Sequence, residues 1–330
     1  MAKTDVVHLL PDGRRLGYCE YGAEDGVPVF ALHGTPGSRF KFAVADKAAR
    51  EIGLRLISPD RWGYGLTDAP PRDVSSLSHY SADLTELADA LGIDKFGVVG
   101  ISGGGPFAVA IAAGAPDRVQ ALALVAPVAP LARADERVGV SLFHRFAFRG
   151  LPRLPGAVAF VFSYFRLALK FVPPLAIRAM ASRASVPDRK ILARREAAED
   201  LVSTFRAGLA KGVQGPVLDI RCFRADWELD LSSIKARARM WLGGEDRNVP
   251  VTAARRLARE IGSMELTDLP GAGHFWVVES YADVLGWLKD ELQGAHHEPL
   301  ASDRTNGTSV AAGDRDYEDR YKSDAHRVSA

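Results

Sequence analysis

The chain contains 330 residues, of which 47% are apolar and 25% charged, enough for one large domain or two smaller ones with a substantial core. The net charge of +1 gives no overall attraction for polyanions, which argues against nucleic acid as a partner. The two cysteines, Cys19 and Cys222, form no Cys-x-x-Cys pair, so no cysteine-based zinc or redox site is expected and both should be small buried side chains.

The first part of the chain alternates strand and helix patterns. Val6–Leu10 and Arg15–Tyr21 flank Pro-Asp-Gly and predict a β-hairpin. Leu77–Leu91 has the apolar spacing of an amphipathic helix, and Gly103–Ala115 is small and apolar, as suits a helix packed closely on a sheet. Short apolar runs typical of buried strands are Val27–Leu32, Leu54–Ser58, Phe96–Ile101 and Val119–Ala126.

The same alternation returns near the end, with strands expected at Arg239–Leu242 and Met264–Leu269 and helices at Val251–Ile261 and Val277–Leu292. Strands that are apolar throughout predict a mostly parallel sheet covered by helices on both faces. We therefore assign residues 1–127 and 233–293 to an α/β core and residues 128–232 to a helical cap insertion. The polar segment 294–330 has too little apolar surface to fold and is expected to be disordered.

The predicted insertion is basic and rich in phenylalanine. Residues 131–195 contain 13 Lys/Arg and 3 Asp/Glu, a local charge of +10, which indicates either a solvated face or attraction of an acidic substrate. Within it, Pro155 and Pro173-Pro174 delimit a helix whose polar side chains form one narrow stripe. Three interpretations of this helix remain: a core helix, the apolar wall of a pocket, or a basic helix that touches anionic lipid.

A Gly-x-Ser-x-Gly motif at residues 100–104 provides a candidate nucleophile, Ser102. In enzymes this motif places serine on a strained turn between a strand and a helix, and the predicted elements on either side meet that requirement. The alternative is a glycine-rich turn with a purely structural serine.

To act as a nucleophile, a serine hydroxyl needs a base that takes its proton. The base in turn needs an anion that orients it and stabilises its protonated form. His274 lies in a loop after the last predicted strand, where a parallel sheet delivers functional side chains, and is the candidate base. Asp246 follows the preceding strand, with Glu245 beside it as a rival; Asp226 and Asp230 in the insertion are weaker candidates. The order serine, acid, histidine is typical of one hydrolase fold.

Acyl transfer also needs hydrogen-bond donors for the developing oxyanion. One should be the N–H of Gly103, which follows the candidate nucleophile. The second should come from the loop at residues 33–37, where we expect the N–H of Thr35. In this loop His33 is expected to organise the backbone and not to act as a base.

Taken together, these motifs resemble the ordered signatures of the α/β-hydrolase superfamily over residues 5–127 and 233–293. The signatures stand at residues 33–37, 60–65, 100–104, 246–250 and 273–274. The resemblance implies eight mostly parallel strands, a cap inserted after the sixth strand, no cofactor, and Asp246 rather than Glu245 as the acid. It also implies that residues 60–65 form a structural loop beside the pocket.

Relatives of this kind include esterases, lactonases, carbon–carbon bond hydrolases, peptidases and cofactor-free perhydrolases. Haloalkane dehalogenases and epoxide hydrolases carry aspartate as the nucleophile, where this chain has Ser102, which argues against both activities. Proline iminopeptidases resemble the loop at residues 33–37, but usually have a bulky residue where this chain has Gly103.

The sequence therefore predicts a serine hydrolase that cleaves small to medium, largely apolar esters or lactones through an acyl-enzyme. The alternatives are a carbon–carbon bond hydrolase or peptidase of the same fold, or a ligand-sensing protein with slow turnover. No apolar leader follows the first residues and no apolar run reaches the ~18 residues of a membrane span, so a soluble cytoplasmic protein without stable membrane insertion is expected. The expected partner is a small-molecule substrate, and homo-oligomerisation is left open.

Overall fold

A computed structural model describes residues 3–71, 76–131, 146 and 150–294. The sheet and the helices inserted into it belong to one compact unit that spans residues 1–296. The tail predicted to be disordered lies, apart from Gly294, outside the described residues.

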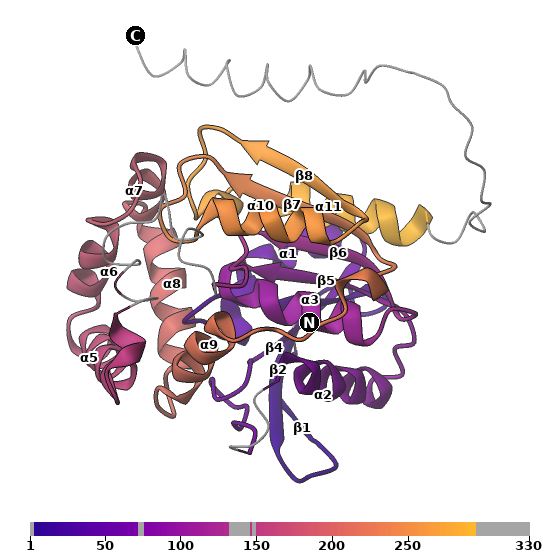
Figure 1. Cartoon of the computed structure of the whole chain (residues 1–330), viewed down its shortest axis with the longest axis horizontal. Coiled ribbons are helices and arrows are strands. Elements are labelled where there is room, and N and C mark those ends of the chain that lie inside the picture. The colour runs from indigo at the N-terminus through magenta and orange to yellow at the C-terminus, as the bar shows by residue number, and fades with distance from the viewer. Residues whose placement is uncertain (1–2, 72–75, 132–145, 147–149, 295–330) are drawn as a thin grey trace. The chain divides into compact units, whose positions relative to one another are not determined.

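Eight strands form a single mostly parallel sheet within the described residues, in the order β1-β2-β4-β3-β5-β6-β7-β8 (Figure 1). Only the pairs β1–β2 and β2–β4 are antiparallel, so the predicted hairpin and the predicted fold class are confirmed. The strands are β1 (Lys3–Leu9), β2 (Arg15–Gly22), β3 (Val27–Leu32), β4 (Leu54–Pro59), β5 (Phe96–Ile101), β6 (Val119–Val125), β7 (Arg237–Gly243) and β8 (Met264–Leu269).

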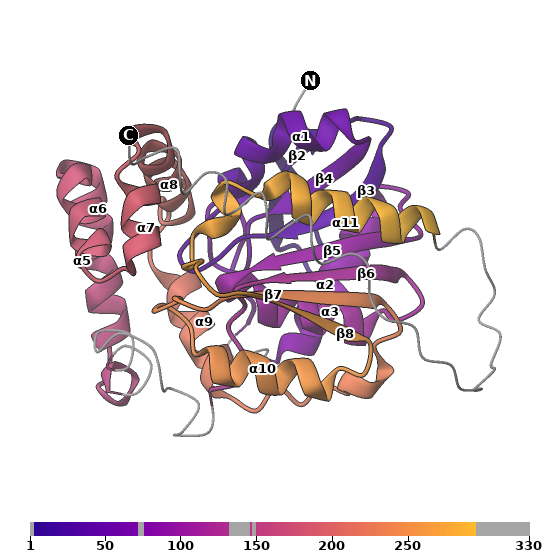
Figure 2. The same ribbon diagram turned by 90° about the horizontal axis from the view of Figure 1, so that it is seen from above.

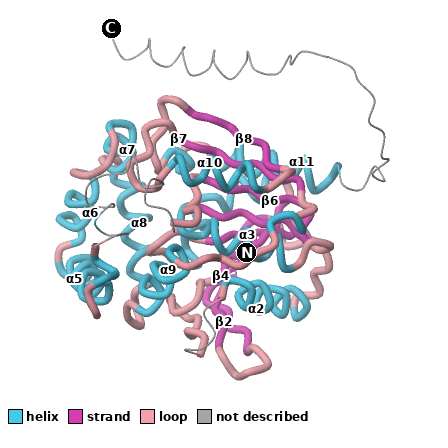
Figure 3. The backbone as a smooth tube through the Cα atoms, in the orientation of Figure 1, coloured by secondary structure: helices cyan, strands magenta, loops and turns pink. Residues whose placement is uncertain are grey.

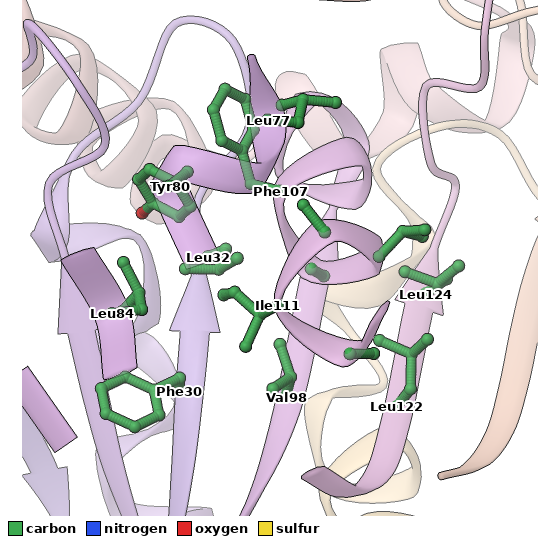
Figure 4. Close-up of a cluster of buried hydrophobic side chains, with 14 of the residues drawn as sticks. Phe30, Leu32, Leu77, Tyr80, Leu84, Val98, Phe107, Ile111, Leu122 and Leu124 are labelled. Atoms are coloured by element: carbon green, nitrogen blue, oxygen red, sulfur yellow. The ribbon is translucent and has the colours of Figure 1, made fainter. Parts of the chain in front are cut away.

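Helices cover both faces of the sheet because its central strands are apolar on both sides (Figure 2). One face packs against α2 (Leu77–Ala90), α3 (Gly105–Gly114) and α10 (Val251–Glu260). The other packs against α1 (Asp46–Glu51) and α11 (Tyr281–Gly294). Figure 4 shows the first core, where side chains of α2 and α3 meet alternate residues of β3, β5 and β6.

The structure differs from the sequence prediction at two helix starts. The last helix begins at Tyr281 and not at Val277, because Trp276–Val278 form a short 3₁₀ turn and the carbonyl of Ser280 accepts the first intrahelical hydrogen bond, from Val284. Likewise, α3 begins two residues later than expected, after a 3₁₀ turn at Ser102–Gly104. Cys19 and Cys222 are both buried, as predicted, and are not joined by a disulfide.

The segment between β6 and β7 is helical where the structure describes it, as expected for an insertion. It contains α5 (Ala157–Phe171), α6 (Pro173–Ala181), α7 (Val186–Leu192), α8 (Arg195–Gly208) and α9 (Gln214–Arg224). These helices gather at one end of the sheet and are joined by short loops (Figure 3). None of the helices in the described ranges is long and apolar enough to cross a bilayer.

Candidate active site

Ser102 occupies a backbone conformation that strains a residue with a side chain. It follows β5 directly and has φ = +54°, in the left-handed region that costs a non-glycine residue about 1–3 kcal/mol. The turn is tight: a Cβ on Gly100 would lie 2.7 Å from the Cβ of Ala108 and 2.8 Å from the carbonyl oxygen of Gly104. The predicted strand, turn and helix around the Gly-x-Ser-x-Gly motif are therefore all present.

His274 and Asp246 stand in line with this serine. The His274 Nε2 lies 3.0 Å from Ser102 Oγ, and its Nδ1 lies 2.7 Å from Asp246 Oδ2. The other oxygen of Asp246 accepts the backbone N–H groups of Asn248 at 2.7 Å and Val249 at 3.1 Å, which fixes the carboxylate. Both His274 and Asp246 are buried, so the imidazole sits in a fixed orientation with a hydrogen-bonding partner at each nitrogen.

The rival acids lie elsewhere. Glu245 is exposed, although it is the sequence neighbour of Asp246. Asp226 accepts the N–H of Glu228 at 3.5 Å, and Asp230 caps a 3₁₀ turn by accepting the N–H of Ser232 at 3.0 Å. The structure thus brings together Ser102, Asp246 and His274 and none of these rivals.

Opposing influences set the pKa of His274. Burial disfavours the imidazolium, but the negative charge of Asp246, its hydrogen bond to the ring, and the charge of Asp188 together outweigh burial and raise the pKa. The positive charge of Lys41 acts in the opposite direction. The imidazole is therefore a stronger base than it would be in the same pocket without the two carboxylates.

The loop at residues 33–37 lies directly against the serine turn. A Cβ on Gly103 would overlap the hydroxyl of Thr35, and a Cβ on Gly34 would lie 3.2 Å from the Cβ of Ser102. Two stretches of backbone far apart in sequence thus meet at the candidate nucleophile. The predicted donors, the N–H groups of Thr35 and Gly103, belong to these two stretches.

His33 is a structural residue, as expected from the sequence. The backbone N–H of Arg61 donates to its Nε2 at 3.0 Å, so Nδ1 carries the proton and donates to the carbonyl of Gly34 at 2.8 Å. Complete burial, and then the neighbouring positive charge of Arg61, hold the pKa of His33 well below its usual value. A neutral imidazole with both nitrogens occupied cannot serve as a base.

A cavity of about 440 Å³ opens over Ser102 and His274. Its walls are mainly apolar and come largely from the inserted helices, with α5 contributing Val158, Val161, Phe162 and Phe165. The opposite side of α5 is not a core contact, since Phe160 and Phe171 are exposed. Of the three interpretations of this helix, the structure supports the apolar pocket wall.

Residues 27–281 match the family model of the alpha/beta hydrolase fold, which is more than half of the chain. The chain belongs to the alpha/beta hydrolase family. The strand order, the serine turn and the helices inserted between β6 and β7 are thus read as features of this fold.

Proteins similar to this chain have several activities. A segment of 123 residues is 39% identical to Epoxide hydrolase 2 of Siraitia grosvenorii and covers 37% of this chain and 38% of that protein. A segment of 123 residues is 35% identical to a non-heme chloroperoxidase of Streptomyces lividans and covers 36% of this chain and 44% of that protein. The chain thus matches less than half the length of these curated relatives. The structure of a thermophilic esterase from Thermogutta terrifontis shares the fold, with a TM-score of 0.62 and 21% identity over 90% of this chain and 99% of that one.

Asp188 of α7, in the insertion, holds the backbone of the loop that carries His274. Its buried carboxylate accepts the N–H of His274 at 2.9 Å, the N–H of Phe275 at 2.8 Å and the hydroxyl of Ser185 at 2.8 Å. A side chain on Gly273 would overlap this carboxylate, which explains the glycine before the histidine. Asp188 is not recognisable in the sequence, because nothing local marks an acid whose partners lie 86 and 87 residues away.

A second carboxylate from the insertion, Asp219 of α9, holds the loop that carries Thr35. It accepts two hydrogen bonds from the buried guanidinium of Arg61, at 2.5 and 2.8 Å, and further ones from the hydroxyls of Thr35 and Tyr64. Arg61 also donates to the carbonyl of His33 at 2.9 Å. Arg61 and Asp219 thus connect the insertion to the loop at residues 33–37. Removing either partner would leave an uncompensated buried charge and should destabilise this connection.

If the site is catalytic, we expect Asp188→Asn to shift the pH dependence of kcat/KM. The charge of Asp188 raises the pKa of His274, so its loss should lower that pKa and move the acidic limb of the profile to lower pH. One backbone N–H should also lose its acceptor, at a cost of about 1–3 kcal/mol in the free energy of unfolding. If Asp188 had a purely structural role, its replacement would lower the maximal kcat/KM without moving the acidic limb of the pH profile. Asp226→Asn, at an exposed site, is the control, and an unmoved limb in Asp188→Asn would contradict the expectation.

Proposed function

We propose that this protein is a serine hydrolase that cleaves small to medium, largely apolar carboxylic esters or lactones through an acyl-enzyme. The observation that carries the proposal is the hydrogen-bonded series Asp246–His274–Ser102, which ends on a left-handed serine beneath an apolar cavity. A serine held 3.0 Å from an imidazole nitrogen is placed to lose its proton as it attacks.

In the proposed reaction, Ser102 Oγ bonds to the acyl carbon while His274 Nε2 takes the hydroxyl proton. The oxyanion that develops is stabilised by the N–H groups of Thr35 and Gly103. His274 then gives the proton to the leaving alkoxide oxygen, which departs as the alcohol, and Asp246 stabilises the imidazolium in the meantime. Water attacks the acyl-enzyme with the same histidine as base, releasing the acid and restoring Ser102.

Two features support an ester rather than an epoxide or a haloalkane as the substrate. The residue at the turn is a serine, whereas the epoxide hydrolases and haloalkane dehalogenases of this fold attack with an aspartate. The cavity of about 440 Å³ has room for a small to medium acyl group and has apolar walls to bury it.

Fluorophosphonate labelling tests the proposal, because the reagent phosphonylates only an activated serine. Wild-type protein should be labelled, Ser102→Ala should not, and a panel of aryl esters and lactones should then be hydrolysed by wild type alone. Labelling that persists in Ser102→Ala, or an unlabelled wild type, would reject Ser102 as the nucleophile. Labelling without turnover would favour a ligand-sensing protein.

We expect kcat/KM on aryl esters to rise from acetate toward hexanoate. Each methylene that leaves water completely contributes about 0.8 kcal/mol, or roughly fourfold, where the transition state retains the contact. Phe162 lines the cavity and Phe160, on the same helix, is exposed. Phe162→Ala should therefore reduce the gain with chain length, whereas Phe160→Ala should not. A series that peaks at acetate would refute the apolar wall as a substrate contact.

A further inference from the structure

The charged side chains around the cavity are all of one sign. Apart from His274, the charged residues among the described part of its lining are Lys41 and Arg183, and no aspartate or glutamate lines it. Arg183 lies on the exposed segment after α6. Lys41 belongs to the 3₁₀ helix Arg39–Ala45, four residues beyond the loop at residues 33–37, and so comes from the α/β core and not from the insertion.

The ammonium group of Lys41 has no partner that neutralises it among the described residues. No hydrogen bond or ion pair of its Nζ is found there, and the ring of Tyr281 lies 6.0 Å away. The nearest acidic influence is Asp200, which shares with Lys41 and Thr204 the lining of a second cavity of about 240 Å³. Burial lowers the pKa of Lys41 to about 8, with Asp200 opposing the shift.

Lys41 is partly buried, so its ammonium group gives up part of its hydration without a counter-ion in hydrogen-bond contact in the described part of the chain, and an anion bound beside it in the cavity would offset that loss. The positive charge also opposes protonation of His274, which places Lys41 within electrostatic reach of the reacting groups. By contrast, cations of the insertion such as Arg178, Arg189 and Lys190 are exposed, so salt screens their attraction for a substrate.

We propose that Lys41 forms a carboxylate subsite of this cavity, and that the substrates are esters or lactones that carry a carboxylate away from the reacting carbonyl. The proposal rests on the proposed function and narrows its substrate class. The neighbouring hydroxyl of the buried Thr204 supplies a second hydrogen-bond donor for the same carboxylate.

The test uses monoaryl esters of dicarboxylic acids, from succinate to suberate. Each is compared with the same aryl ester in which the free carboxylate is replaced by a neutral carboxamide. The measured quantity is the ratio of kcat/KM for the carboxylate ester to that for its amide at pH 7. A charge-assisted hydrogen bond should give a ratio on the order of 10 to 100 at the chain length that spans the two groups. Lys41→Gln should bring the ratio close to one, Lys41→Arg should retain it, and Lys47→Gln, at a side chain 85% exposed, is the matched control.

Dependence on pH and salt separates Lys41 from the exposed cations. In wild type the ratio should fall as pH rises through about 8, when the ammonium loses its proton, and Lys41→Arg should keep the ratio at pH 9. Asp200→Asn should move this fall to lower pH. Titration of His274, beside Asp246 and Asp188, changes kcat/KM for both substrates by the same factor and therefore cancels in the ratio. A preference caused by exposed arginines would instead fade at 0.5 M salt and survive in Lys41→Gln.

A ratio near one in wild type, or a ratio unchanged in Lys41→Gln, would overturn the subsite while leaving ester hydrolysis intact. If no ester is hydrolysed, the proposed function fails, and the subsite is then decided by binding. Calorimetric titration with hexanoate and hexanamide should show tighter binding of hexanoate to wild type but not to Lys41→Gln. Equal affinities of wild type for the two compounds would overturn the subsite.

Discussion

Replacing Ser102 with alanine should abolish ester hydrolysis, with a loss in kcat on the order of 10⁶, the size found when a triad member is removed from a serine protease. The variant retains the cavity and the proposed oxyanion donors but has no oxygen to bond to the acyl carbon. The fold should persist, because alanine occupies the left-handed position, at φ = +54°, with the same strain as serine. Steady-state hydrolysis of an aryl ester by wild type and Ser102→Ala measures the loss of activity, and thermal unfolding of the same two proteins measures whether the fold persists.

A variant that keeps more than a tenth of the wild-type rate would show that another group attacks. Ser78→Ala, at an exposed serine in the first turn of α2, is the control for the purification and assay and should be fully active. A large drop in melting temperature in Ser102→Ala would mean that its lost activity reports unfolding. In that case Ser102→Gly, which removes the hydroxyl and relieves the strain of the left-handed conformation, should be folded and should also lose fluorophosphonate labelling.

Replacing Asp246 with asparagine should lower kcat by about 10⁴, because an amide at this position favours the tautomer of His274 that cannot accept the serine proton. The hydrogen bond of 2.7 Å between Asp246 Oδ2 and His274 Nδ1 presently holds the useful tautomer. The same change removes a charge that raises the pKa of His274, so the remaining activity should show its acidic limb at lower pH. Measuring kcat and kcat/KM from pH 5 to 9 separates the two effects.

Glu245→Gln is the matched control for this variant, since it removes one carboxylate charge from the adjacent, exposed residue. It should stay within a few-fold of wild type, because screening weakens exposed charges. If Glu245→Gln proves the more damaging of the two, the acid of the site is not Asp246.

The sequence by itself determined most of the strands and the three residues that meet at the site. Strand β5, the turn at Ser102 and helix α3 are encoded within about twenty consecutive residues, where hydrophobic period and glycine placement act locally. Asp246 and His274 each follow a strand of the same parallel sheet, and carboxyl ends of such strands meet at one edge. Local pattern and sheet topology therefore sufficed to bring these side chains together.

Only the tertiary structure decided how the insertion serves the site. Asp188 reaches His274 across 86 residues, and Asp219 reaches Arg61 across 158, so no local pattern in the sequence could pair them. From the sequence, the helix after Pro155 could be a core helix, a pocket wall or a lipid-contacting helix, and only the packing showed which side faces the cavity. Lys41 became informative for the same reason: whether a lysine is solvated or confined beside a substrate depends on the elements that fold over it, here α8, and not on its own sequence neighbours.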